Sequence, residues 1–235
     1  NHLTHLEIKG LWSHFSTAEN ENLTYANLQS DRFSRVVECA HKLGVDPQIV
    51  HLANSGAFLQ MGETVFYDMV RIGILLYGYP PSPHLTNNLP IQPIMTLKSR
   101  VVYVKKPPAG TKIGYGATWE SPGEHWIATV PIGYGDGYPR RAGNRGWVYL
   151  RGRKCPIVGK VSMDQITIDA GQEAYLGDEV LLFGQTSQGN LDLWDLCQVI
   201  DATPYEILCG LTSRVERIYI PKAKTATSYQ LESAK

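Results

Sequence analysis

The segment VRIGILLYGYPPSPHLTNNLP, residues 70–90, contains the point at which the character of the chain changes. Residues 70–78 form a nearly continuous apolar run, which is typical of a β-strand covered on both faces in a parallel sheet. Residues 79–90 are rich in proline and predict a linker. We therefore expect one structural unit over residues 1–88 and a different one over residues 89–235.

The part before the linker alternates strand and helix signals. Residues 3–12 and 48–55 are expected strands, and the second leads into a short helix at residues 56–60. Four apolar side chains between the strands recur at helical spacing and define one helix face: Phe33, Val36, Val37 and Ala40. Gly44 suits the position just after that helix. This alternation predicts a parallel α/β sheet or barrel. Because a closed (β/α)8 barrel needs about 250 residues, three strands form either a small open sheet or the C-terminal part of a barrel.

The part after the linker predicts an all-β domain, because its apolar segments are short and are separated by glycine, proline and asparagine. The expected strand segments are IMTLKSRVVYVKK, WIATVPIGY, WVYLRGRKCPIVG, VSMDQITIDA and DEVLLFG. One helix is expected near residues 191–200, and RVERIYIPK at residues 214–222 is expected to return to strand.

Composition narrows the class of protein. The chain has 235 residues with 22 basic and 22 acidic side chains, and this balance argues against a nucleic-acid or membrane-surface binder. No stretch approaches the roughly 20 apolar residues of a membrane span. Four scattered cysteines lack metal-binding spacing and favour free thiols in a cytoplasmic protein without a metal site: Cys39, Cys155, Cys197 and Cys209. The chain opens without methionine, so we expect a fragment of a longer protein.

Polar side chains follow the expected strands of the first unit. Ser55 lies at a helix N-terminus, where phosphate can bind, although the simpler interpretation is that Asn54 or Ser55 is an ordinary N-cap. Arg71 lies within an apolar strand and needs either a structural salt bridge or a ligand, which Gly73 would allow to approach. His14 follows the first strand in the same way. Because the carboxyl ends of parallel strands meet at one edge, these residues predict a site there.

Several glycine-rich and aromatic segments of the second part are weak signals singly. They are KIGYGATW (112–119), PIGYGDGYPRR (131–141), VSMDQ (161–165) and PYEIL (204–208). Ordinary turns, strands or helix caps explain each of them. Tyr115 differs because the glycines on both sides leave unusual space around its phenol.

Taken together and in order, the segments resemble the alanine racemase family over residues 10–219. The matching segments are GLWSHF, HLANSGAF, VRIGILLYG, KIGYGATW, PIGYGDGYPRR, PIVGKVSMDQ, LGDEV, YEILC and SRVERIY. The resemblance implies a pyridoxal-phosphate-dependent enzyme that interconverts L- and D-alanine for peptidoglycan synthesis. It also implies a (β/α)8 barrel followed by a β-rich domain, and a head-to-tail homodimer in which the β-rich domain of one subunit caps the active site of the other.

The resemblance also implies roles for individual residues. Tyr115 matches the catalytic tyrosine, which exchanges the Cα proton on the face used for L-alanine and must be tuned, because an ordinary tyrosine pKa is about 10. His14 matches a histidine that hydrogen-bonds an arginine at the position of Arg71, and this arginine faces the pyridine nitrogen. Tyr134 and Met163 match residues that line the substrate pocket from the partner subunit. Five residues match the phosphate cradle or lie beside it: Asn54, Ser55, Gly73, Ile74 and Tyr205.

One feature of the family has no counterpart. The lysine that anchors the cofactor and serves as the second base lies in a segment resembling AVVKANAYGHG, and no lysine here has that context. We therefore expect that this chain alone does not racemise alanine. Two other functions remain open: a racemase for serine or for a broader set of amino acids, and a non-enzymatic β-barrel that binds nucleic acid or carbohydrate. A pyridoxal-phosphate-binding homeostasis protein is disfavoured, because such proteins lack the appended β-rich domain.

Overall fold

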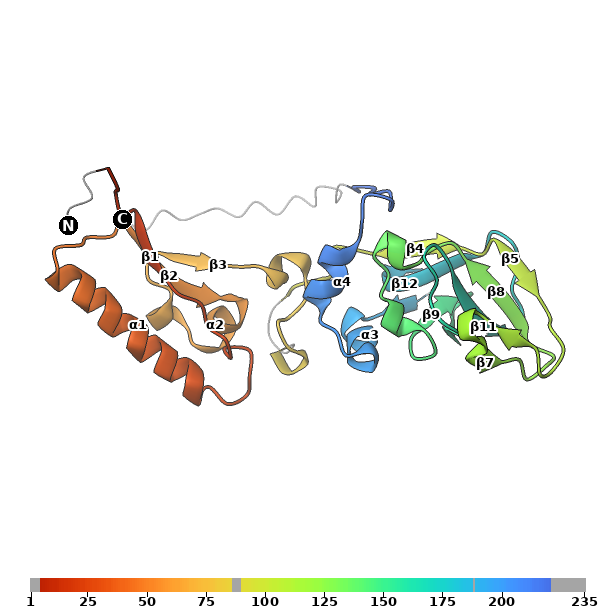
Figure 1. Cartoon of the computed structure of the whole chain (residues 1–235). Coiled ribbons are helices and arrows are strands. Elements are labelled where there is room, and N and C mark those ends of the chain that lie inside the picture. Colours follow the sequence, from red (N-terminus) through yellow and green to blue (C-terminus); the bar gives the residue numbers. More distant parts are fainter. Residues whose placement is uncertain (1–4, 86–89, 188, 221–235) are drawn as a thin grey trace.

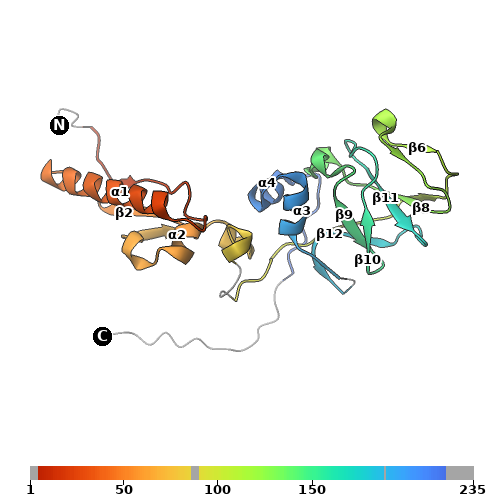
Figure 2. The same cartoon turned by 90° about the horizontal axis from the view of Figure 1, so that it is seen from below.

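The computed structural model describes residues 5–85, 90–187 and 189–220, and these form two lobes (Figure 1). The N-terminal lobe combines a small sheet with helices, and the β-rich lobe follows it along the chain. Two helices, α3 (Leu193–Ile200) and α4 (Pro204–Gly210), lie on the side of the β-rich lobe that faces the N-terminal lobe, in both views (Figures 1 and 2). Among the described residues, no helix has the length and apolar character needed to cross a membrane.

The N-terminal lobe contains a three-stranded parallel sheet in the order β1 (Gly10–Trp12), β2 (Ile49–Asn54) and β3 (Met69–Arg71). Helix α1 (Thr24–Lys42) connects the first two strands, and α2 (Ser55–Gln60) follows the second directly. This order confirms the predicted alternation of strand and helix. The described residues contain no closed barrel.

Helix α1 uses the apolar face that the sequence predicts. Phe33 is buried, and Val37 packs against the same core, whereas Val36 lies at the exposed edge of the face. Gly44 has a φ of 73°, the left-handed conformation that favours glycine, and its N–H donates to the carbonyl of His41 to end the helix. From the sheet, Val50 and Leu52 point to the same side and close this small core.

The apolar run of residues 70–78 is not a single strand, so that prediction was wrong in extent. Strand β3 ends at Arg71, and a short 3₁₀ helix, η2 (Ile74–Tyr77), follows it. Gly73 separates the two with φ of −109° and ψ of −91°, which belong to neither element. The first strand is also shorter than predicted, because pairing with β2 begins at Gly10; residues 3 and 4 lie outside the described residues.

The first residues of the predicted linker pack against the β-rich lobe. Tyr79 is buried in the core of the β-rich lobe, and the indole N–H of Trp194 donates to the carbonyl of Pro80 at 3.1 Å. A short 3₁₀ helix, η3 (Pro83–Leu85), follows, and residues 86–89 are outside the described part of the chain.

The strands of the β-rich lobe form antiparallel pairs, and their number confirms the prediction that this part of the chain is rich in β-structure. One sheet has the order β10-β9-β12-β13 with β4 also paired to β12, another has the order β11-β8-β5, and β6 pairs with β7. The strands are β4 (Leu97–Arg100), β5 (Tyr103–Lys105), β6 (Lys112–Ile113), β7 (Trp119–Glu120), β8 (Trp126–Val130), β9 (Trp147–Leu150), β10 (Arg153–Pro156), β11 (Ile166–Gly171), β12 (Glu179–Thr186) and β13 (Gly189–Leu191).

The C-terminal helices confirm one prediction and add an element that was not predicted. Helix α3 is confirmed, and Asp192 caps its first turn. Helix α4 was missed, although Thr203 caps it and Pro204 occupies its first turn, which are ordinary helix-start signals. The predicted strand at residues 214–222 is wrong for its described part, because residues 214–220 form no strand and Tyr219 is exposed without a pairing partner.

Candidate active site

Arg71, the last residue of β3, is held at the carboxyl end of the parallel sheet by acceptors from β2 and from the residues that follow β1. Its Nη1 lies 2.6 Å from Nδ1 of His51, and its Nη2 lies 2.9 Å from Nδ1 of His14. Nη2 also donates to the carbonyl oxygens of Ser13 at 2.8 Å and Leu52 at 3.2 Å. Because a guanidinium only donates, both imidazoles accept through Nδ1, and for His51 this places the proton of the neutral ring on Nε2.

The charge of Arg71 is therefore surrounded by neutral acceptors. Among the described residues, no carboxylate forms an ion pair with it, so the structural salt bridge considered from the sequence is not seen. Burial lowers the pKa of Arg71, but arginine remains protonated in proteins. Burial and, next, the charge of Arg71 lower the pKa of His51, which agrees with its role as a neutral acceptor.

At the turn between β2 and α2, the sequence left open whether Asn54 and Ser55 cap the helix or bind phosphate, and the structure gives the two residues different contacts. Asn54 is the N-cap, because its Oδ1 accepts from the N–H of Ala57 at 3.0 Å while its Nδ2 donates to the carbonyl of Phe15. Ser55 is 3% exposed, and its Oγ accepts from the N–H of Gly73 at 3.0 Å. A hydroxyl that accepts this bond still has its own proton to donate, so Ser55 can bind an anion.

Gly73 faces open space, since a Cβ built on it would meet no atom within 4 Å. The space lies where η2 begins, and Ile74 starts that helix with its side chain buried in the core. The residues present thus fit a phosphate group held by a hydroxyl and backbone N–H groups rather than by basic side chains.

Tyr205 belongs to the other lobe. It lies in α4 and is partly exposed. Burial raises the pKa of its phenol, and the charge of Glu19 raises it further. The structure thus gathers His14, Asn54, Ser55 and Arg71 at the sheet of the N-terminal lobe with Gly73 beside them, whereas Ile74 packs into the core of the β-rich lobe. Among the described residues, no hydrogen bond or ion pair joins Tyr205 to them.

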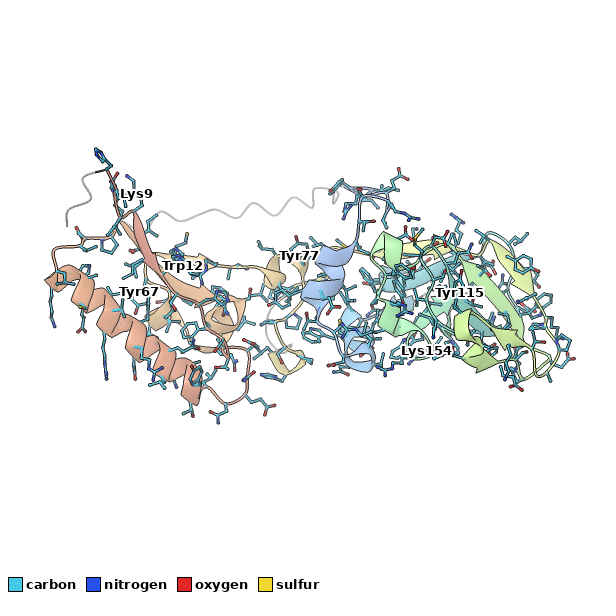
Figure 3. All side chains as sticks on the ribbon, viewed as in Figure 1. Lys9, Trp12, Tyr67, Tyr77, Tyr115 and Lys154 are labelled. Atoms are coloured by element: carbon cyan, nitrogen blue, oxygen red, sulfur yellow. The ribbon has the colours of Figure 1, made fainter. Side chains whose placement is uncertain are left out.

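The other three predicted site residues form a separate group on loops of the β-rich lobe. Tyr115 is 74% exposed, Tyr134 48% and Met163 52%. The loops of Tyr134 and Met163 are joined, because the N–H of Gly135 donates to the carbonyl of Met163 at 2.7 Å. Gly114 has a φ of 73° and packs against Gly159, which sets the turn that presents Tyr115. Figure 3 shows Tyr115 on the β-rich lobe, well separated from Trp12 on the sheet, so one chain does not bring the two groups together.

Two contributors were not predicted. His51 was overlooked, although the alternation along β2 puts it on the same sheet face as Arg71, and this signal was available. Trp12 stacks on His51 with ring centroids 6.1 Å apart.

The fold and the site define a two-lobed protein. Its α/β lobe holds the guanidinium of Arg71 at the strand ends, and its β-rich lobe carries loops with exposed aromatic side chains. The comparisons with known proteins are specific about the family. The family model described as the alanine racemase C-terminal domain matches residues 94–219, and that of the N-terminal domain matches residues 1–81. The chain belongs to the alanine racemase family.

Individual relatives agree with this assignment. The chain is 42% identical to the alanine racemase of Halothermothrix orenii over 221 residues, which are 93% of this chain and 58% of that protein. It is 40% identical to the enzyme of Symbiobacterium thermophilum, covering 92% and 58% of the two chains. The crystal structure of alanine racemase from Bacillus anthracis with bound L-Ala-P has a TM-score of 0.84 at 36% identity, covering 92% of this chain and 56% of that one. The chain thus spans somewhat over half the length of the relatives it matches. These relatives have a barrel followed by a β-rich domain.

Proposed function

We propose that this chain supplies the cofactor cradle and the partner-directed loops of a pyridoxal-phosphate-dependent alanine racemase that acts in the cytoplasm for peptidoglycan synthesis. The single observation that carries the proposal is the cluster around Arg71, in which His14 accepts from the guanidinium at 2.9 Å. Residues 1–88 are the C-terminal part of a (β/α)8 barrel, and residues 89–235 are the β-rich domain. The family-model matches at residues 1–81 and 94–219, which leave the linker between them, support this division.

The residues of the cradle divide the binding of pyridoxal phosphate between them. In this proposal Ser55, the backbone at Gly73 and Ile74, and the phenol of Tyr205 surround the phosphate. Asn54 fixes the turn that presents Ser55, and the N–H of Gly73 orients the Ser55 hydroxyl. When bound, pyridoxal phosphate withdraws electrons from the Cα–H bond of the amino acid and makes that hydrogen acidic. Arg71 would donate a hydrogen bond to the ring nitrogen while keeping its own proton, so that nitrogen would stay unprotonated. The ring therefore accepts less electron density, which favours return of the proton to Cα and disfavours transamination.

Tyr115 gives or takes the Cα proton through its phenol oxygen on the face used for L-alanine. Its exposure and its distance from the Arg71 cluster support a head-to-tail homodimer in which Tyr115, Tyr134 and Met163 complete the site of the partner. A phenol with the ordinary pKa of about 10 is a poor base at neutral pH, so a hydrogen bond or cation in the assembled site must tune it. No lysine of the chain matches the second base, which a segment outside the 235 residues supplies.

The test compares this chain with a longer protein that joins it to a segment carrying the lysine. With pyridoxal phosphate and L-alanine, the longer protein is expected to form D-alanine and to act more slowly on L-serine, because a pocket shaped for a methyl group has little room for more. The chain alone is expected to form none. Turnover by the chain alone, or a longer protein that prefers serine, would contradict the proposal.

A further inference from the structure

The sheet of the N-terminal lobe has a second face, opposite to α1 and α2. Because side chains alternate along strands, Val50 and Leu52 point to the helices, and His51 between them points away. Trp12 and Arg71 lie on this same open face, as their contacts with His51 require. The open face therefore carries an aromatic ring, an imidazole and a cation side by side on three neighbouring strands.

These three groups form one stack. The rings of Trp12 and His51 are 6.1 Å apart between centroids and almost parallel, at 7°. The guanidinium carbon of Arg71 lies 5.3 Å from the centroid of the Trp12 ring, within the range of a cation–π interaction. Trp12 is 61% exposed, so the ring is not held there by burial in the core of the lobe.

The stack adds a contact with the guanidinium of Arg71 that its hydrogen bonds do not provide. The contacts with His51, His14 and the backbone carbonyls use Nη1 and Nη2, and among the described contacts none involves Nε. These acceptors fix one edge of the guanidinium, whereas the Trp12 ring adds a contact at the guanidinium carbon. An aromatic face also attracts the cation without neutralising it, as a carboxylate would.

We propose that Trp12 is a positioning residue for Arg71: it holds the guanidinium so that its remaining N–H donors point to the pyridine nitrogen of the cofactor. This inference rests on the proposed function and concerns the same site. Trp12 does not touch the reacting atoms in this account; it acts through Arg71, both directly and through the ring of His51.

The experiment measures binding of two probes to the whole chain by equilibrium dialysis. One probe is pyridoxal phosphate, and the other is its 1-deaza analogue, in which a C–H replaces the ring nitrogen. W12L removes the aromatic face, and W12F retains one. W147L is the matched control, because Trp147 in β9 also lies against a cation, the ammonium of Lys154 at 3.4 Å from the ring centroid, but in the other lobe.

W12L is expected to bind pyridoxal phosphate about five- to tenfold more weakly than the unchanged chain, from the usual strength of a cation–π contact and its effect on one hydrogen bond. W12F and W147L are expected to stay within about twofold. The 1-deaza analogue is expected to bind the unchanged chain and W12L alike, because it offers no acceptor to Arg71. Equal weakening of both probes by W12L, or no weakening of either, would overturn the inference.

A second readout separates this inference from the proposed function. If the unchanged chain does not bind pyridoxal phosphate, the proposed function fails. The ¹⁵N chemical shifts of His51 in the ligand-free chain then decide whether Trp12 orients Arg71. They are expected to report the Nε2–H tautomer in the unchanged chain and W12F, and a mixture in W12L, since Nδ1 loses its fixed donor. An unchanged His51 tautomer in W12L would refute the positioning role.

Discussion

The cluster around Arg71 and the loops of the β-rich lobe differ in how far contacts within the chain hold their side chains. Around Arg71, acceptors from β2 and from the residues after β1 hold Nη1 and Nη2 within one chain. On the loops, hydrogen bonds fix the backbone while the side chains of Tyr115, Tyr134 and Met163 extend outward. This difference agrees with the proposal that the residues around Arg71 are arranged within one chain, whereas the loops act on a partner subunit.

The largest effect is expected at Tyr115. In a longer protein that contains the lysine segment, Y115F should lower the rate of D-alanine formation by about a thousandfold, since it removes a proton-transfer group. Cofactor binding by the same variant should not change, because the exposed side chain leaves the cradle intact. Racemase assays and dialysis with pyridoxal phosphate measure the two quantities. A Y115F variant that lost cofactor binding would break the division between the two regions.

A smaller effect is expected at Arg71. R71K keeps a positive charge but loses the planar fork that reaches two imidazoles and two carbonyls. Dialysis should show pyridoxal phosphate binding about 10- to 30-fold weaker, the cost of one to two charge-assisted hydrogen bonds. R141K is the control, because Arg141 binds Glu206 and the carbonyl of Asp201 within the β-rich lobe. Equal affinity of R71K and the unchanged chain would contradict the account of the cradle.

The smallest effect is expected at Asp136, whose contacts hold the loop that carries Tyr134. Asp136 accepts from the N–H of Gly133 at 2.8 Å and from Nε of Arg214 at 3.0 Å, and its side chain is 13% exposed. D136N should lower the free energy of unfolding of the β-rich lobe by about 1 to 2 kcal/mol, because it weakens two hydrogen bonds to a charged group. Urea unfolding followed by tryptophan fluorescence measures this. The same loss in D164N, whose carboxylate has no such ion pair in the described structure, would show that the Asp136 contacts are not the cause.

Local sequence signals predicted much of the fold. The spacing of Phe33 and Val37 and the position of Gly44 predicted α1, and the apolar periodicity of residues 191–200 predicted α3. The break after Arg71 could not be predicted in this way. It depends on Gly73, whose N–H meets the hydroxyl of Ser55 from 18 residues earlier.

The candidate site depends even more on contacts between residues that are far apart in the sequence. Single residues such as Arg71 and His14 were predicted as site residues because they are polar groups in or after apolar strands. Their contact spans 57 positions, and no local pattern specifies it. It was expected only through the resemblance to the family. Trp12 was missed because it resembles an ordinary strand residue until the register of β1 and β2 is known, whereas His51 was overlooked although the alternation along β2 already indicated its sheet face. The separation of Tyr115 from Arg71 likewise depends on how the lobes are arranged.

The central claim is that Arg71 of one subunit works with Tyr115 of the other, and mixing two inactive variants of the longer protein tests it most directly. R71M and Y115F should each be inactive alone. In a mixed dimer, one site combines an intact Arg71 with an intact Tyr115, and the other site has neither. Because random exchange of equal amounts makes about half of the dimers mixed, the account predicts recovery of about a quarter of the activity of the unchanged protein. Subunit exchange without any recovery would show that the two residues act within the same chain and would contradict the account.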